Sequence, residues 1–123
     1  MPLRGRSVQG SWRAGTCATL PLRSVQEGSG SAFTVYAHWP LEDFELSGDI
    51  SSFDGRGFCP RCGSRLMDTS DPGDSHVEIR LGTLDDAPFD LKPEAEIWVK
   101  RRESWILPVE GAAQYDENRR HGL

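Results

Sequence analysis

The residues with the clearest capacity for chemistry form the segment Phe58-Cys59-Pro60-Arg61-Cys62-Gly63-Ser64. Two residues between the thiols let both sulfur atoms face one ion from a tight turn, and the glycine lets the backbone turn after the second cysteine. Cys59 and Cys62 are therefore candidate metal ligands that would supply half of a tetrahedral zinc site. Two alternatives remain open, a reduced pair without a ligand and a redox dithiol. The redox centre requires a helix that begins at the first cysteine, but Gly63 follows at once without an amphipathic run.

The chain has three cysteines, and only Cys59 and Cys62 lie close together in sequence. An odd number with one close pair argues against a secreted disulfide framework and favours a reducing compartment. Cys17 is assigned no role. No apolar run approaches the roughly 18 residues of a membrane span, and residues 1–26 lack the apolar stretch of a secretory signal. We therefore expect a cytoplasmic protein without a membrane partner.

The formal net charge of −5 is distributed unevenly. Residues 1–26 contain four arginines and no acidic residue, whereas the remainder carries ten basic and nineteen acidic side chains. A nucleic-acid partner would depend on this short basic segment alone, so none is expected. The same composition would also suit an organellar transit peptide, but prolines and glycines interrupt the amphipathic helix that such peptides form.

Short strands must position the cysteine pair, because no segment shows a 3.6-residue hydrophobic period over three turns. Alternation and β-forming residues predict strands at 31–39, 50–53, 57–58, 76–81 and 95–101. Asp54-Gly55 predicts a hairpin turn, Pro40 predicts a short helical turn over 41–44, and the composition of 68–75 predicts a loop. The fold class is thus mainly β, in a single domain with few short helical turns.

The other polar and aromatic candidates are interpreted as structural. Trp98 and Trp105 could line a cleft, but aromatic residues on alternating strands more often belong to a core. Surface, strand or turn positions are assigned to the remaining candidates: His38, His76 and His121, the pair Asp85-Asp86, and the basic run Lys100-Arg101-Arg102.

Five sequence blocks, in order and in register, resemble the glutathione-dependent formaldehyde-activating family, which includes centromere protein V-like proteins. The blocks are Gly28-Ser29-Gly30-Ser31-Ala32-Phe33, then 56–64, Gly82-Thr83-Leu84-Asp85-Asp86, Pro93-Glu94-Ala95-Glu96-Ile97-Trp98 and Ser104-Trp105. The resemblance implies an Mss4-like tent of antiparallel sheets around a zinc knuckle. It also implies carbon–sulfur lyase activity that forms or cleaves S-hydroxymethylglutathione, with zinc as cofactor and a glutathione-type molecule as partner. Some related proteins act without known catalysis.

The resemblance also identifies what this sequence lacks. The family holds a structural zinc with an early Cys-x-Cys-Gly and a later pair that corresponds to Cys59 and Cys62. A catalytic zinc sits on Cys-x-Cys-x-x-Cys just before the Gly28 block, with one coordination position open for the substrate thiol. Here residues 20–25 read Leu-Pro-Leu-Arg-Ser-Val, none of which binds zinc. The chain as written therefore offers no catalytic residue, and the alternative is a non-catalytic, zinc-supported binding module. Glu96 stands where the family commonly has histidine.

A shifted reading frame could explain the missing cysteines. Met1-Pro2 must be encoded ATG-CCN, which contains TGC, a cysteine codon, one base out of frame. Permitted codons for Leu3 to Gly5 complete Cys-x-Cys-Gly in that frame, and permitted codons for residues 20–26 give Cys-His-Cys-Ala-Arg-Cys. We therefore divide the chain into an aberrant, frame-shifted amino terminus (1–27), a family-like domain (28–118) and a frayed tail (119–123).

Overall fold

The computed structural model describes residues 8–10, 17–21, 23–69, 75–84 and 91–118. The strands in this part of the chain are β1 (Val8–Gly10), β2 (Cys17–Leu20), β3 (Thr34–Pro40), β4 (Phe44–Leu46), β5 (Ser51–Phe53), β6 (Arg56–Phe58), β7 (Arg65–Thr69), β8 (His76–Arg80), β9 (Ala95–Glu96) and β10 (Ala113–Gln114). The helical elements are α1 (Arg23–Ser29) and three 3-10 turns, η1 (Leu41–Asp43), η2 (Leu81–Thr83) and η3 (Val99–Arg101). The mainly β prediction is confirmed.

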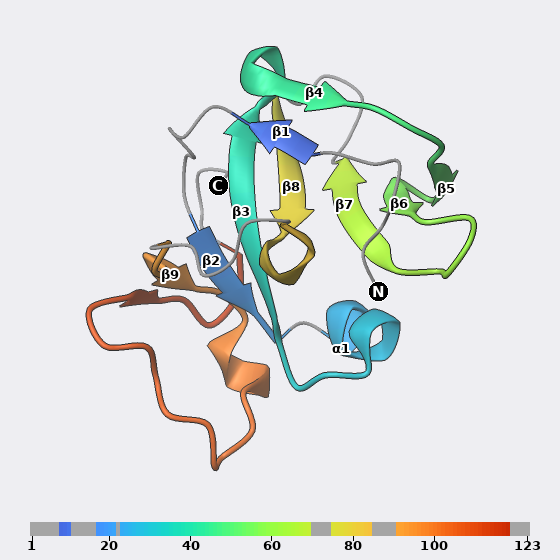
Figure 1. The fold of residues 1–123 in the computed structure, drawn as a ribbon. Helices are drawn as coiled ribbons and strands as arrows, with labels where there is room; N and C mark the ends of the chain where they lie inside the picture. Colours follow the sequence, from blue (N-terminus) through green and yellow to red (C-terminus); the bar gives the residue numbers. More distant parts are fainter. Residues whose placement is uncertain (1–7, 11–16, 22, 70–74, 85–90, 119–123) are drawn as a thin grey trace.

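Eight strands form one sheet in the order β10-β9-β2-β3-β8-β7-β6-β5, and β1 pairs with β4 in a separate two-stranded sheet. The pairings from β2 through β3, β8, β7 and β6 to β5 are antiparallel, while β2–β9 and β9–β10 are parallel. Figure 1 shows β3 running through the middle of the molecule, with β2 on one side and β8 on the other. Tyr36 to Trp39 are all buried, so both faces of β3 are covered.

The strands around the cysteine pair follow the sequence closely. Asp54 (φ 50°) and Gly55 (φ 73°) both adopt positive φ between β5 and β6, as a two-residue hairpin turn requires. The predicted loop at 68–75 is wrong at its start, because β7 includes Asp68 and Thr69. Buried polar partners hold the Asp68 carboxylate, as described below, and residues 70–74 lie outside the described part. The helical turn expected after Pro40 is present as η1.

The main hydrophobic core lies on the middle strands of the large sheet. It combines side chains from β3, β7 and β8: Ala37, Trp39, Leu66, Met67, Val77 and Ile79. Phe44, Ile50, Leu81, Leu84 and Leu91 pack against it while partly buried. Val77 and Ile79 alternate as the sequence predicted, and both are fully buried.

The predicted strand at 95–101 is wrong beyond Glu96. Trp98 adopts left-handed backbone angles (φ 59°, ψ 34°), which end the extended chain, and η3 follows directly. The core interpretation is also wrong for Trp105, whose exposed fraction is 74%. Trp98 is partly buried, and its indole N–H donates to Asn118 Oδ1 at 2.6 Å.

Helix α1 was not expected, because its local signals were masked by the surrounding prolines and glycines. It begins two residues after Pro21 and carries an i,i+4 ion pair between Arg23 and Glu27 at 2.8 Å. It ends where Gly30, with φ +66°, donates its N–H to the Gln26 carbonyl. Val25 buries its side chain. Among the described residues, no helix is long and apolar enough to cross a membrane.

Candidate functional site

The loop that carries the two cysteines joins β6 to β7 and is closed by backbone hydrogen bonds. The Cys59 N–H donates to the Ser64 carbonyl at 2.9 Å, and the Gly63 N–H donates to the Cys59 carbonyl at 2.8 Å. Gly63 adopts φ +74°, a left-handed conformation that a residue with a Cβ takes only with strain. The glycine after the second cysteine therefore has the backbone role expected from the sequence.

The two thiols differ in their surroundings. Cys59 is buried, and its Sγ accepts the N–H groups of Arg61 and Cys62, each at 3.3 Å. Cys62 is exposed, and its Sγ lies 3.3 Å from Ser64 Oγ. Main-chain N–H donors directed at a sulfur suit a thiolate ligand. The loop therefore presents two thiols from a turn with donors already directed at one of them.

The described residues do not complete a four-ligand site around this pair. They contain no group of three or more histidine, cysteine or acidic side chains that could hold a metal ion. Zinc binding by Cys59 and Cys62 therefore stays a prediction. His121 and the Asp85-Asp86 pair lie outside the described residues.

The two described histidines lie in strands, but they differ in exposure. His76 is exposed at the start of β8, with its Nδ1 2.9 Å from Ser75 Oγ. His38 is buried in β3, and this burial, with a smaller contribution from His76, lowers its pKa to about 4. The expected surface or strand position therefore holds for both histidines, and His38 takes a buried strand position.

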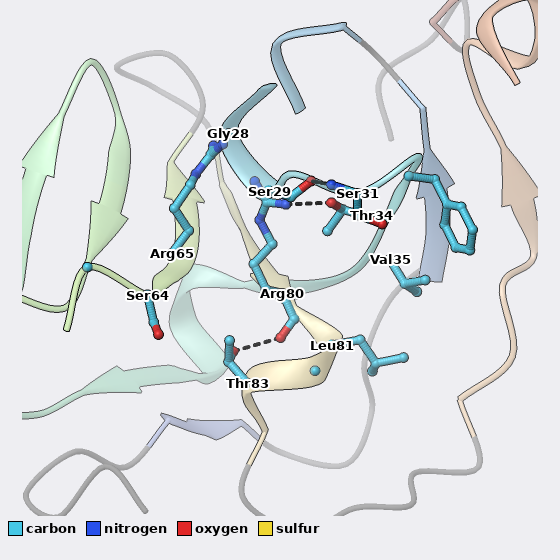
Figure 2. A pocket seen from close by; sticks show the side chains of 13 residues that line it. Gly28, Ser29, Ser31, Thr34, Val35, Ser64, Arg65, Arg80, Leu81 and Thr83 are labelled. Carbon is cyan, nitrogen blue, oxygen red and sulfur yellow. Dashed lines mark hydrogen bonds between the residues drawn. The ribbon is translucent and has the colours of Figure 1, made fainter. Parts of the chain in front are cut away.

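An open pocket of about 730 Å³ lies beside the cysteine loop. Three segments that are distant in sequence form its walls: the end of α1 with the turn into β3, the end of the cysteine loop, and the end of β8 with η2 (Figure 2). Its lining residues are Gly28, Ser29, Ser31, Phe33, Thr34, Val35, Gly63, Ser64, Arg65, Arg80, Leu81, Gly82 and Thr83. Three of the five sequence blocks singled out above therefore meet at one pocket.

The lining of this pocket combines a mostly apolar surface with hydroxyl groups and two positively charged side chains. Serine and threonine hydroxyls come from all three walls, together with the guanidinium groups of Arg65 and Arg80. The lining residues that the structure describes include no acidic side chain. An anionic group would therefore meet complementary charge and hydroxyl donors in this pocket.

Next to the pocket lining, Asp68 is the centre of a partly buried polar cluster. Arg65 Nη2 donates to both carboxylate oxygens, at 2.9 and 3.0 Å, and the Tyr36 hydroxyl donates to Oδ2 at 3.1 Å. Burial and the neighbouring Asp68 charge raise the pKa of Tyr36, so its hydroxyl remains a donor. Asp68 and Thr69, which were predicted as loop, pair with Glu78 and Val77 of β8 and therefore belong to a strand.

Arg80 extends from β8 into the same cluster with fewer partners. Its Nη1 donates to Thr34 Oγ1 at 2.7 Å, and its guanidinium lies over the Tyr36 ring, 4.5 Å from the centroid. Its Nη2 is 3.6 Å from Asp68 Oδ2, too long for a hydrogen bond. Burial lowers the pKa of Arg80. Arg65 and Arg80 were not predicted from the sequence, although Arg65 directly follows the block at 56–64 and Arg80 lies two residues before the block at 82–86.

Glu96 forms a second polar centre, away from the cysteine loop. Its exposed fraction is 4%, and its carboxylate accepts Thr19 Oγ1 at 3.0 Å, the Val109 N–H at 3.0 Å, Arg102 Nη1 at 3.1 Å and Gln114 Nε2. Burial alone would raise the pKa of Glu96, but these donors lower it on balance. The solvated-face interpretation is therefore wrong for Arg102, and it holds for the exposed Lys100 and Arg101.

These features define a mainly β domain in which a two-cysteine loop borders a cationic, hydroxyl-lined pocket. The chain matches the family model described as glutathione-dependent formaldehyde-activating enzyme over residues 22–101, which is more than half of its length. It therefore belongs to this family, as its sequence blocks indicated. No curated protein matches the sequence.

Proposed function

We propose that the pocket beside the cysteine loop binds a glutathione-type thiol substrate, and that the family chemistry at this site is of the carbon–sulfur lyase type. One observation carries the proposal: the blocks at 28–33, 56–64 and 82–86 are separate in sequence, yet all three contribute walls to one pocket. A volume of about 730 Å³ lies within the roughly 300–1,000 Å³ of pockets that enclose small molecules.

Zinc is the proposed cofactor, held in part by Cys59 and Cys62. A zinc ion bound by thiolates would stabilise the loop and, with an open position, would keep a substrate thiol deprotonated. The closed loop and the N–H donors on the Cys59 sulfur support the assignment of these two ligands. The remaining ligands are not found among the described residues.

We propose that the protein as written binds the substrate but does not turn it over. The pocket walls are present, whereas residues 20–25 supply no zinc-binding side chain. This combination also favours the second candidate, a non-catalytic binding module of the same fold. An NMR exchange assay of S-hydroxymethylglutathione formation tests the proposal, and we expect the spontaneous rate with and without the protein. A protein-dependent rate that a chelator abolishes would contradict inactivity and support a complete metal site.

The frame-shifted amino terminus, residues 1–27, also remains a proposal, with 28–118 as the family domain and 119–123 as a frayed tail. The match over 22–101 begins inside that segment. Determining the nucleotide sequence of codons 1–28 tests it. We expect TGC in the shifted frame at Leu3-Arg4, Leu20-Pro21, Leu22-Arg23 and Val25-Gln26. Codons that give no cysteine at these junctions would leave a divergent amino terminus and favour the binding module.

The cysteine content and the acidic remainder of the chain support the proposed setting, which is the cytoplasm with a small-molecule partner and no nucleic-acid or membrane partner. Fractionation of cells that express the protein natively tests this setting. Recovery with membranes or nucleic acid at physiological salt would contradict this setting.

A further inference from the structure

The two sulfurs of the cysteine loop differ sharply in their access to solvent. Cys62 is exposed, whereas the exposed fraction of Cys59 is 1%. A thiol reacts only with a reagent that reaches its sulfur. A sulfur compound that arrives from solution therefore meets Cys62 before Cys59.

The buried sulfur lies beside the main chain of the exposed cysteine. Cys59 Sγ accepts the Cys62 N–H at 3.3 Å, and that nitrogen is three bonds away from Cys62 Sγ. The Arg61 N–H donates to Cys59 Sγ at the same distance and helps to hold it there. One turn of the chain therefore keeps the two sulfurs close, and rotation about the Cys62 Cα–Cβ bond changes their separation.

The exposed cysteine also borders the pocket. Gly63 and Ser64 line the pocket, and Cys62 comes directly before them in the chain (Figure 2). Cys62 Sγ lies 3.3 Å from the hydroxyl oxygen of Ser64, which is itself an exposed residue. A sulfur compound held in the pocket therefore lies close to the protein sulfur that solvent reaches.

We propose that Cys62 is a site of thiol–disulfide exchange with a low-molecular-weight disulfide of the glutathione type, and that Cys59 then closes the pair to an intramolecular disulfide. The closure rests on the cysteine loop itself, whereas the preference for a glutathione-type disulfide rests on the proposed function. The pair changes state once for each oxidation, so it does not require the helix of a redox enzyme centre. Since zinc binds thiolates, the disulfide would exclude the proposed metal from both sulfurs, and the pair is a redox switch.

The exchange proceeds in two steps with a disulfide RSSR as the oxidant. The Cys62 sulfur attacks one sulfur of RSSR, the S–S bond breaks, and Cys62–S–S–R forms while one RSH leaves with the Cys62 proton. Cys59 Sγ then attacks Cys62 Sγ, the mixed disulfide breaks, and the second RSH leaves with the Cys59 proton. The two cysteines lose two electrons, and RSSR gains them.

Oxidation of the full chain by glutathione disulfide, followed by mass spectrometry without reductant, tests the proposal. Trypsin cleaves after Arg56, Arg61 and Arg65, so Cys59 and Cys62 fall in separate peptides, 57–61 and 62–65. We expect a glutathione adduct on 62–65 that decays as the two peptides become linked and the protein loses two hydrogen atoms. A first adduct on 57–61, adducts on both peptides without a link, or no reaction would each overturn the proposal.

Variants assign the two steps to their cysteines. Cys59→Ser should leave the adduct on Cys62 unresolved, and Cys62→Ser should abolish both steps at the pair. Cys17→Ser is the matched control, because it removes the third cysteine and should leave the link unchanged. If Cys59→Ser or Cys62→Ser does not fold, the peptide map of the wild type still decides, because its two peptides are either linked or separate. A folded Cys62→Ser protein in which Cys59 reacts as fast as wild-type Cys62 would overturn the assignment.

A second oxidant separates the switch from the proposed function. Hydroxyethyl disulfide is neutral and carries no peptide, and each rate is divided by the rate of the same disulfide with free cysteine. We expect glutathione disulfide to react about 10-fold faster by this measure, the ratio that one hydrogen bond to a charged group provides. Equal relative rates would leave the switch standing and contradict the glutathione-directed function. Glutathione binding in the pocket without oxidation of the pair by either disulfide would overturn the switch and leave the proposed function standing.

Discussion

Glu96 provides a quantitative test of how the carboxy-terminal segments are held on the sheet. Its carboxylate accepts four donors, from β2, the residue after η3, β10 and the chain before β10. Glu96→Ala would leave the Thr19 hydroxyl, the Val109 N–H and the Arg102 guanidinium without this acceptor. Breaking a buried ion pair by removing one partner costs about 3–5 kcal/mol, because the other charge remains buried. Arg102 keeps Gln114 Oε1 at 2.7 Å, so we expect the lower end, about 3 kcal/mol.

Glu96→Gln separates charge from shape. The amide keeps one acceptor oxygen but directs an NH₂ group toward donors, so we expect a loss of about 1–3 kcal/mol. Glu94→Ala is the matched control, because Glu94 is exposed two residues earlier, and its loss should be within about 0.5 kcal/mol. Urea unfolding followed by circular dichroism measures all three, at constant m-value. A loss below about 1 kcal/mol for Glu96→Ala would refute the view that this carboxylate holds the four segments together.

Three further predictions concern metal content, pH and packing. Elemental analysis should find less than one zinc per chain, because Cys59 and Cys62 are two of four ligands, and two tightly held zinc ions would contradict this. The pKa of His38 is about 4 when folded and about 6.5 when unfolded, so the unfolded chain binds the proton first. Stability should therefore fall by about 3 kcal/mol between pH 6.5 and 4, measured by urea unfolding, with a flatter profile for His38→Gln; equal profiles would refute it. Gly57→Ala should lower the free energy of unfolding by about 1–3 kcal/mol in the same assay, because its Cβ would lie 2.8 Å from Met67 Cγ. An unchanged unfolding midpoint would contradict this, because it would show that the Met67 side chain moves aside without cost.

The strands could be predicted where the local sequence pattern agrees with the position that the residues take in the folded structure. Asp54-Gly55 specifies its turn through backbone preference alone, and Val77 with Ile79 specifies a buried strand face. The end of the strand predicted at 95–101 could not be placed from the sequence. Trp98 ends it by adopting a left-handed conformation, which the sequence does not indicate for a residue other than glycine. Helix α1 has only seven residues, which is too short to show a helical period in the sequence. The neighbouring Pro21 also argued against a helix there.

The site was predictable in part for a similar reason. The spacing of Cys59 and Cys62 is a local signal, so the loop and its glycine were identified from sequence. Arg65 and Arg80 are 15 positions apart, and only the pairing of β7 with β8 brings them to one wall. An arginine in a strand is normally interpreted as solvated, and only its burial shows otherwise. Glu96 likewise has no local pattern, because its four donors come from separate segments.

The amino-terminal question and the pocket are connected through α1. Gly28 and Ser29 at the end of α1 line the pocket, and Val25, one turn earlier, is buried. Reading the shifted frame would place cysteines at the positions of Leu20, which ends β2, of Leu22, which lies outside the described residues, and of Val25, which lies within α1. Because Val25 already points inward, a cysteine there would also point inward, on the same short helix as the pocket wall. We therefore expect that restoring the frame returns zinc binding and lyase activity together, while glutathione binding in the pocket changes little, since the residues that line the pocket all lie outside residues 1–27. A restored protein that gained zinc but lost glutathione binding would show that the written amino terminus itself shapes the pocket.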